Sequence, residues 1–172
     1  AGECGLDYYR NYSPPTEQRR AFALQLQLAA ERGLPIFLHQ REAHSDLMAM
    51  LREHPQLLPR AVLHCFTGGM AELEDCLGAG LAVGVTGWIC DERRGQALRD
   101  AVSRIPDDRL MLETDGPYLL PRTIQPKPAH RRNEPMYLPV ILETVAACRG
   151  QSIDQLAEIT TANARRFFGL KL

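Results

Sequence analysis

Short apolar runs that do not alternate with polar residues recur along this chain, and they constrain its fold more than any other feature. Four of them are Leu34–Leu38, Ala61–Leu63, Leu81–Val85 and Leu110–Leu112. A strand that is apolar on both faces must be covered on both faces, as in a parallel sheet with helices on either side. The first residues are interpreted as the tail of a fifth such strand, which ends at Glu3.

Segments with helical spacing separate these runs. Ser13 as a cap and Pro14 at the first helical position predict a helix that Gly33 ends. Further helices are expected through residues 47–51, over Met70–Gly78, Arg93–Val102 and Glu134–Cys148, after a Ser152 cap, and over Thr161–Phe168. Strand ends near residues 3, 39, 64, 86 and 115 leave room between them for one helix and one strand each. The pattern predicts an α/β fold and a single domain over residues 1–172.

Composition excludes several classes of function. Twenty Lys and Arg against 21 Asp and Glu give a net charge of −1, which excludes a nucleic-acid or membrane binder that works by bulk positive charge. The longest apolar stretch, Ala79–Cys90, is broken by glycines, so no membrane span is expected. The first ten residues lack the features of a signal peptide. Five cysteines without C-x-x-C spacing are interpreted as reduced thiols of a cytoplasmic protein.

Four potential metal ligands stand at predicted strand ends: Glu3, His39, His64 and Asp115. In a parallel α/β barrel these ends converge on one face, where active sites lie. Carboxylates and imidazoles together suit Mg²⁺, Mn²⁺ or Zn²⁺. Such an ion polarises a phosphoryl or carbonyl oxygen and makes hydroxide available near neutral pH. Asp115 could bind the metal, take the proton from water, or do both. The alternative is that each histidine is an ordinary core or rim residue and that Glu3 is only a polar residue at a strand end, so that none of them binds a metal.

Basic residues at the same rim are candidate phosphate ligands. Arg41 follows the second predicted strand, and a long loop, Gly116–Asn133, carries Lys127, Arg131 and Arg132. Guanidinium groups hold phosphate in a bidentate manner, and a loop of this length in a compact domain is usually functional. The alternative is that these charges are simply solvated.

Several further residues receive a structural interpretation. Surface positions are expected for His44, His54 and His130, and a core position for Cys65. Trp88 and Tyr118 follow predicted strand ends, where their rings either stack on a nucleobase or pack at the mouth of the barrel.

Six motifs together carry a family resemblance. They are G-E-C-G-L-D (Gly2–Asp7), L-H-x-R (Leu38–Arg41), L-H-C-F-T-G (Leu63–Gly68), T-G-W (Thr86–Trp88), E-T-D-x-P-Y-L (Glu113–Leu119) and P-K-P…R-R-N-E-P (Pro126–Pro135). In this order they resemble the TatD family of metal-dependent deoxyribonucleases over essentially the whole chain. The resemblance implies a (β/α)8 TIM barrel of the amidohydrolase-like group. It also implies divalent-metal-dependent hydrolysis of phosphodiester bonds in DNA, with 3′–5′ exonuclease action on single-stranded DNA and RNA.

The same resemblance implies roles for particular residues. Glu3, His39, His64 and Asp115 are expected to bind the metal, with Asp115 and Glu3 as catalytic residues and Asp115 near the attacking water. Mg²⁺ is the expected ion, with Zn²⁺ and Mn²⁺ as alternatives. From their own chemistry and position, Arg41, Lys127, Arg131 and Arg132 are expected to bind the substrate.

Two departures from the family pattern shape the remaining expectations. The sequence contains no His-x-His pair, which the family carries on its first strand, and it offers five strand ends where the barrel has eight. We therefore expect the C-terminal part of one barrel domain, with impaired hydrolysis, that self-associates through an open sheet edge or pairs with the missing N-terminal segment. Two alternatives are a metal-dependent amide or ester hydrolase of the same barrel group, and a non-catalytic fragment that associates through its open edge.

Overall fold

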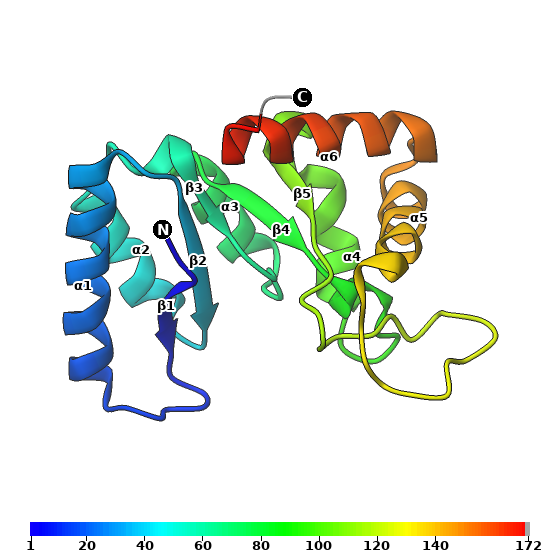
Figure 1. Ribbon diagram of the computed structural model, residues 1–172, viewed down its shortest axis with the longest axis horizontal. Coiled ribbons are helices and arrows are strands. Elements are labelled where there is room, and N and C mark those ends of the chain that lie inside the picture. Colours follow the sequence, from blue (N-terminus) through cyan, green and yellow to red (C-terminus); the bar gives the residue numbers. More distant parts are fainter. Residues whose placement is uncertain (171–172) are drawn as a thin grey trace. The chain divides into compact units, whose positions relative to one another are not determined.

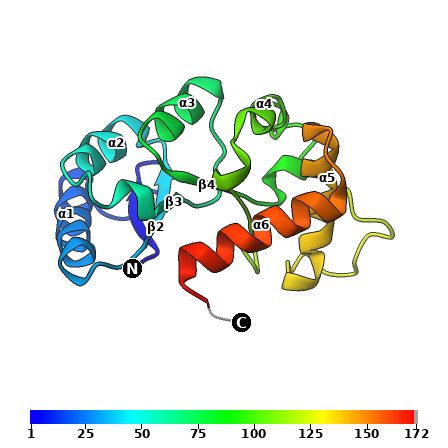
Figure 2. The same cartoon turned by 90° about the horizontal axis from the view of Figure 1, so that it is seen from above.

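The computed structural model describes residues 1–170 as two compact units in which strands and helices alternate along the chain (Figures 1 and 2). The first unit comprises residues 1–64 and 74–82, and the second comprises residues 65–73 and those from 83 onward. Helix α3 (Met70–Gly78) carries residues of both units.

The first unit is a parallel sheet with helices. Its elements are β1 (Cys4–Asp7), α1 (Pro15–Arg32), β2 (Ile36–Arg41), α2 (His44–Arg52), a 3₁₀ turn (Leu58–Arg60) and β3 (Ala61–Leu63). Strand β2 pairs with β1 on one side and with β3 on the other, both in parallel. Because the strands run the same way, their carboxyl ends lie at one edge of this sheet.

The second unit repeats the alternation. Its elements are β4 (Ala82–Val85), a 3₁₀ turn (Gly87–Cys90), α4 (Gln96–Ala101), two 3₁₀ turns (Val102–Arg104 and Asp107–Arg109), β5 (Leu110–Leu112), a 3₁₀ turn (Pro135–Tyr137), α5 (Leu138–Arg149) and α6 (Ile153–Phe168). Strands β4 and β5 pair in parallel. The buried Asn163 of α6 donates from Nδ2 to the carbonyl oxygens of Asp107 and Leu110, at 2.6 and 2.8 Å, and so ties this helix to the start of β5.

The predicted α/β pattern of buried parallel strands is confirmed, but two strand ends were placed wrongly. Strand β1 begins at Cys4, so Glu3 precedes a strand instead of ending one. Strand β2 runs on to Arg41, so His39 lies inside it. The reason is the parallel ladder, in which Gly5 pairs with His39 and continues past the apolar residues. Gly5 has φ of 152°, and a Cβ there would collide with the His39 carbonyl, so the close approach requires glycine.

Helix starts were predicted less well than helix ends. Ser13 is not a cap: α1 starts at Pro15 after Pro14, and the Ser13 carbonyl instead accepts a hydrogen bond from Gln18 Nε2 at 2.8 Å. Gly33 ends α1 as predicted, in the left-handed conformation with φ of 59°.

Among the later helices, one predicted start is confirmed and one is wrong. The predicted Ser152 cap is confirmed, because its Oγ accepts from the backbone amide of Gln155 at 3.2 Å. Helix α6 is one continuous helix and includes the predicted segment Thr161–Phe168. Helix α4 starts at Gln96 instead of Arg93, since the amides of Arg93 and Arg94 are held in a turn by the Asp91 carboxylate.

Each unit has an apolar interior. In the first it includes Leu6, Phe22, Ile36, Leu38 and Leu51, and in the second Val83, Val85, Leu110, Ile141 and Leu156, all buried. Among residues 1–170, no helix has the length and hydropathy needed to cross a bilayer.

Candidate metal centre

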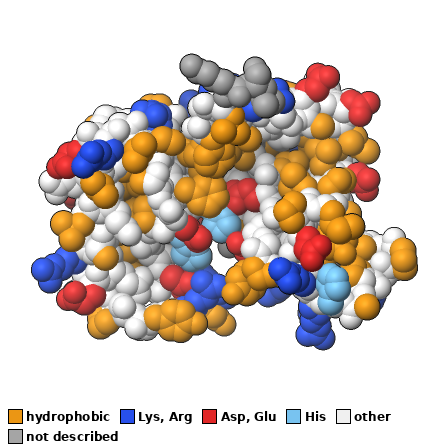
Figure 3. Space-filling view, viewed as in Figure 1, with side chains coloured by type: hydrophobic (Ala, Val, Ile, Leu, Met, Phe, Trp, Pro, Cys, Tyr) orange, Lys and Arg blue, Asp and Glu red, His pale blue; other side chains and the backbone are white. Residues whose placement is uncertain are grey.

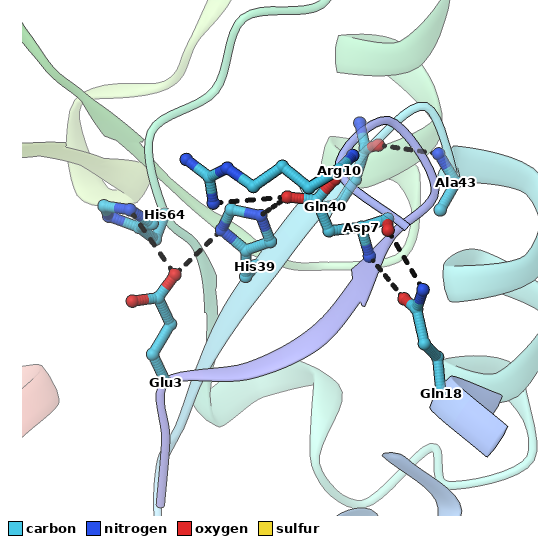
Figure 4. A network of polar contacts seen from close by, with 8 residues as sticks. All are labelled: Glu3, Asp7, Arg10, Gln18, His39, Gln40, Ala43 and His64. Carbon is cyan, nitrogen blue, oxygen red and sulfur yellow. Dashed lines mark hydrogen bonds and ion pairs between the residues drawn. The ribbon is translucent and has the colours of Figure 1, made fainter. Parts of the chain in front are cut away.

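Three side chains of the first unit point toward one another (Figure 4). Oε1 of Glu3 lies 2.8 Å from Nδ1 of His39 and 3.8 Å from Nε2 of His64. The three residues offer one ligand atom each, and these atoms all lie within 4.8 Å of one another. Glu3 comes from the residue before β1, His39 from β2 and His64 from the residue after β3. The structure thus brings together three of the four ligands predicted from sequence.

Backbone pairing and packing fix the two imidazoles. The amide of His64 donates to the Leu38 carbonyl at 2.9 Å, which extends the pairing of β2 and β3 by one residue. The His64 ring lies against Phe37, with ring centroids 5.1 Å apart, and its side chain is only 7% exposed. The His39 and His64 rings lie 6.2 Å apart and are tilted by 31°. The cluster is therefore held at the ends of paired strands, with His39 inside β2 and Glu3 and His64 directly adjacent to β1 and β3.

Asp7 belongs to the same cluster, although sequence reasoning gave it no role. Its Oδ2 lies 3.3 Å from His39 Nε2 and 3.2 Å from Arg10 Nη1, and its Oδ1 accepts from the Arg10 backbone amide at 2.7 Å. Partial burial raises the pKa of this carboxyl, but the hydrogen bonds from Arg10 and His39 and their charges outweigh that effect, and its pKa lies below the ordinary value. The signal was present: Asp7 closes the motif Gly2–Asp7 and stands at the true end of β1.

The donor set fits a divalent cation. One carboxylate and two imidazoles are typical ligands of Zn²⁺ and of other divalent transition metals, whereas Mg²⁺ favours oxygen ligands. The chain offers Glu3 at 46% side-chain exposure, beside a pocket of about 360 Å³ that is also lined by Asp7 and His39. Glu3 and His39 are therefore reachable from the solvent, whereas His64 approaches them from the buried side.

Asp115, the fourth predicted ligand, belongs to the second unit, so its part in the metal centre stays a prediction. It follows β5 and adopts a left-handed conformation with φ of 57°. Its carbonyl accepts from the Tyr118 amide at 2.8 Å. Nearby, Asn133 Nδ2 donates to the Thr114 carbonyl at 2.6 Å, which fixes the start of the long loop to its end.

The predicted phosphate ligands occupy different settings. On β2, the Arg41 guanidinium carbon lies 3.7 Å from the centroid of the Tyr9 ring, a cation–π contact. In the second unit, Lys127 and Arg131 line a pocket of about 670 Å³. Figure 3 shows Lys and Arg side chains beside a histidine over the long loop. Arg132 is not among the residues that line this pocket, and its Nε lies 3.7 Å from Glu134 Oε1.

Some structural interpretations were wrong. His44 is not a surface residue: its side chain is 13% exposed and its Nε2 lies 3.2 Å from Asp75 Oδ2, a partner 31 positions away in the sequence. Cys65 is not a core strand residue, because β3 ends at Leu63. It is half-buried with φ of 47°, and its Sγ lies 3.1 Å from Thr86 Oγ1.

Other interpretations hold in part. His130 is exposed as predicted, whereas His54 is half-buried. The Trp88 ring carries the Arg94 guanidinium at 4.3 Å from its centroid, so a protein cation already covers one face. Tyr118 is 68% exposed. These two rings are therefore not equivalent as stacking surfaces.

Comparison with known proteins places this arrangement in a family. A family model described as TatD related DNase matches residues 1–169. The chain belongs to this family. Two curated relatives, from Musicola paradisiaca and Dickeya dadantii, are each named 3′-5′ ssDNA/RNA exonuclease TatD and are 59% and 60% identical to the chain. The matches cover 98% and 97% of this chain but 64% and 63% of the relatives, so the chain spans a little under two thirds of their length.

Solved structures confirm the predicted fold class, that of the TatD-type barrel hydrolases. The TatD homologue YjjV from Escherichia coli K12 superposes with a TM-score of 0.87 at 29% identity, over 99% of this chain and 63% of that one. A TatD family hydrolase from Entamoeba histolytica gives 0.84 at 27% identity, over 96% and 62%.

Proposed function

We propose that this chain provides the metal centre and part of the substrate surface of a divalent-metal-dependent nuclease that removes nucleotides from the 3′ end of single-stranded DNA or RNA. The observation that carries the proposal is the approach of Glu3, His39 and His64, whose ligand atoms lie within 4.8 Å of one another. Family membership supports the reaction class, because relatives 59–60% identical to this chain carry an exonuclease name.

Each residue has a stated task in the proposed reaction. Glu3, His39 and His64 hold the cation, and Asp115 is proposed as a fourth ligand that also accepts a proton from the attacking water. When bound, a divalent ion supplies Lewis acidity toward the phosphoryl oxygen and lowers the pKa of water. Glu3 is also proposed as a catalytic residue, because its negative charge lies beside both imidazoles where the cation would be held. Water attacks phosphorus and forms a new phosphorus–oxygen bond, the bond from phosphorus to the departing sugar oxygen breaks, and that oxygen takes up a proton from the solvent.

Basic side chains are proposed to hold the nucleic-acid backbone. Arg41 lies against Tyr9, so its guanidinium is already oriented by the ring. Lys127 and Arg131 line one pocket, which supports their proposed contact with phosphate, and Arg132 is exposed beside them in the sequence. Few phosphates are contacted in this proposal, because the net charge of the chain is only −1.

Hydrolysis of a 5′-labelled single-stranded oligonucleotide tests the proposal, with excess protein so that slow turnover is visible. Mg²⁺, Mn²⁺ and Zn²⁺ are added separately, and EDTA removes them. We expect slow, metal-dependent shortening from the 3′ end that is lost in His64→Ala. A chromogenic ester serves as the competing substrate. Ester cleavage without nucleotide release, or hydrolysis that survives both EDTA and His64→Ala, would contradict the proposal.

Substrate contacts are tested by binding in EDTA, where hydrolysis is suppressed. Each phosphate contact to a single strand contributes roughly 0.7 to the slope of log affinity against log salt. The double variant Lys127→Gln/Arg131→Gln is expected to weaken binding and to lower this slope. Arg104→Gln, an exposed arginine on a 3₁₀ turn, is the matched control and leaves both unchanged. Equal salt slopes of binding in all three proteins would show that the pocket does not contact the substrate.

The 172-residue chain itself is proposed to be a weak enzyme that self-associates. It carries no His-x-His pair, and β1 stands at the end of the strand order with β2 as its partner among the described residues. An open strand edge favours pairing with another chain, either a second copy or an N-terminal segment supplied separately. Light scattering on a size-exclusion column checks this: a compact monomer, or rapid turnover with Mg²⁺, would contradict it.

A cytoplasmic location is also proposed. It is supported by the five cysteines, all of which are free thiols. Cell fractionation with an antibody against the chain tests it, and recovery in an oxidising compartment would contradict it.

A further inference from the structure

The two ring nitrogens of His39 face two different carboxylates. Nδ1 lies 2.8 Å from Glu3 Oε1, on the side of the proposed metal ligands. Nε2 lies 3.3 Å from Asp7 Oδ2, on the other side of the ring (Figure 4). A neutral imidazole can offer a lone pair on only one nitrogen, because the other carries the proton. An acceptor at Nε2 therefore favours the tautomer in which Nδ1 is available as a ligand.

The position of Asp7 is set by contacts other than the one to His39. Gln18 of α1 holds the Asp7 backbone on both sides, since its Oε1 accepts from the Asp7 amide at 2.8 Å and its Nε2 donates to the Asp7 carbonyl at 3.0 Å. The Arg10 amide donates to Oδ1 at 2.7 Å and fixes the carboxylate rotamer. With a side-chain exposure of 17%, the carboxylate has limited access to water. It is thus in place before any cation binds.

We propose that Asp7 is the positioning residue of the metal centre: its Oδ2 accepts the Nε2 proton of His39 and so keeps the Nδ1 lone pair directed at the cation. The inference rests on the proposed function, because it concerns the same metal centre. A carboxylate that accepts from the second nitrogen of a ligating histidine orients the ring and raises its basicity. Asp7 does not itself touch the cation or the substrate in this arrangement.

An asparagine at this position would reverse the arrangement. The Arg10 amide is a fixed donor 2.7 Å from Oδ1, so the amide oxygen of Asp7→Asn must occupy that place. The amide nitrogen then faces His39 Nε2 and donates to it. The ring proton moves to Nδ1, where it blocks the lone pair. A residue of nearly identical shape thus gives a defined chemical change.

The experiment is a comparison of Zn²⁺ affinity by titration calorimetry in three proteins: the unaltered chain, Asp7→Asn and Arg10→Gln. We expect Asp7→Asn to bind Zn²⁺ roughly 10–100-fold more weakly, the range for loss of such a partner. Arg10→Gln is the matched control. It removes the exposed guanidinium from the same carboxylate but keeps the backbone donor, so its affinity should change by less than about threefold.

A spectroscopic signature separates positioning from a general loss of structure. Long-range ¹H–¹⁵N correlation spectra of the Zn²⁺-loaded, unaltered chain are expected to show the His39 proton on Nε2 and the metal on Nδ1. This measurement needs no variant, so it stands even where Asp7→Asn fails to fold.

The outcomes distinguish this inference from the proposed function. An unaltered chain that binds Zn²⁺ through Nε2 of His39, or an Asp7→Asn chain that binds as tightly as the unaltered one, overturns the role of Asp7 and leaves the metal centre standing. An unaltered chain that binds no Zn²⁺ overturns the metal centre and with it the role of Asp7. Nucleotide release is measured separately and does not enter either decision.

Discussion

Two carboxylates, Glu3 in the first unit and Asp91 in the second, show how different partners give similar groups different roles. Asp91 is buried and surrounded by donors: the amides of Arg93 and Arg94 at 3.0 and 3.1 Å, and the Arg94 guanidinium at 2.8–2.9 Å. Burial raises the pKa of Asp91, but these hydrogen bonds and the Arg94 charge outweigh it and lower the pKa to about 2. Asp91 is therefore fully satisfied by the protein.

Glu3 has a different environment. Its Oε1 faces nitrogen atoms of His39 and His64, which are themselves metal ligands when neutral, and its side chain is 46% exposed. A carboxylate is a candidate metal ligand when its neighbours can bind the same cation, as the imidazoles beside Glu3 can. It has a structural role when its neighbours are permanently charged cations, as Arg94 is beside Asp91.

Removal of the metal-facing carboxylate is expected to have the largest effect. Glu3→Ala should weaken Zn²⁺ binding by more than the roughly 10–100-fold typical of an outer partner, because a direct ligand is lost. Urea unfolding without metal should be unchanged within about 0.5 kcal/mol, since Glu3 is exposed. A loss of unfolding free energy in Glu3→Ala as large as that in an Asp91 variant would contradict the different roles of the two carboxylates.

Asp91→Asn is expected to lower the stability of the chain and to leave its Zn²⁺ affinity unchanged. The lowered pKa corresponds to about 2 kcal/mol of stability at neutral pH, and urea unfolding measures its loss. Zn²⁺ affinity should stay at the unaltered value, with Glu3→Ala as the paired control. Weaker metal binding in Asp91→Asn at full stability would show that the second carboxylate is not merely structural.

The Asp91 contribution should also depend on pH with a defined sign. Its pKa is lowered on folding from the ordinary value of 3.8 to about 2, so the unfolded chain binds the proton more readily. The stabilisation is complete above the unfolded pKa and disappears as pH falls through the folded one. The difference in unfolding free energy between the unaltered chain and Asp91→Asn should shrink by roughly half between pH 7 and pH 3. A difference that grows toward acid would contradict this.

The smallest effect is expected at the rim of the Asp91 cluster. Arg122 Nη1 lies 3.6 Å from Asp91 Oδ2 and its side chain is 49% exposed, so Arg122→Gln should cost about 0–0.5 kcal/mol in urea unfolding. Arg94→Gln should cost more, because Arg94 makes the short contacts and packs on Trp88. Equal losses in both variants would mean that distance and packing do not rank these ion pairs.

Much of the fold could be predicted because buried parallel strands leave a strong pattern in sequence. Runs such as Ala61–Leu63 and Leu110–Leu112 coincide with β3 and β5. Strand ends were less predictable, since the ladder that extends β2 to Arg41 depends on the pairing of Gly5 with His39, not on apolar content.

The sequence was enough to predict three ligands of the candidate site, but not the residues that contact and orient them. Glu3, His39 and His64 were identified from their places near strand ends, and they do come together. Asp7 was missed because the first strand was placed before it. The partial burial of His44 was missed because its partner, Asp75, comes from α3 and cannot be identified from local spacing. Contacts between distant segments are the part that a single sequence leaves undetermined.

Anomalous diffraction from crystals soaked in Zn²⁺ tests the central claim most directly, because it locates the ion without any assumption about the reaction. The account predicts a single strong peak in contact with Glu3 Oε1, His39 Nδ1 and His64 Nε2. A peak elsewhere, or none at these three atoms in crystals that took up zinc, would contradict it.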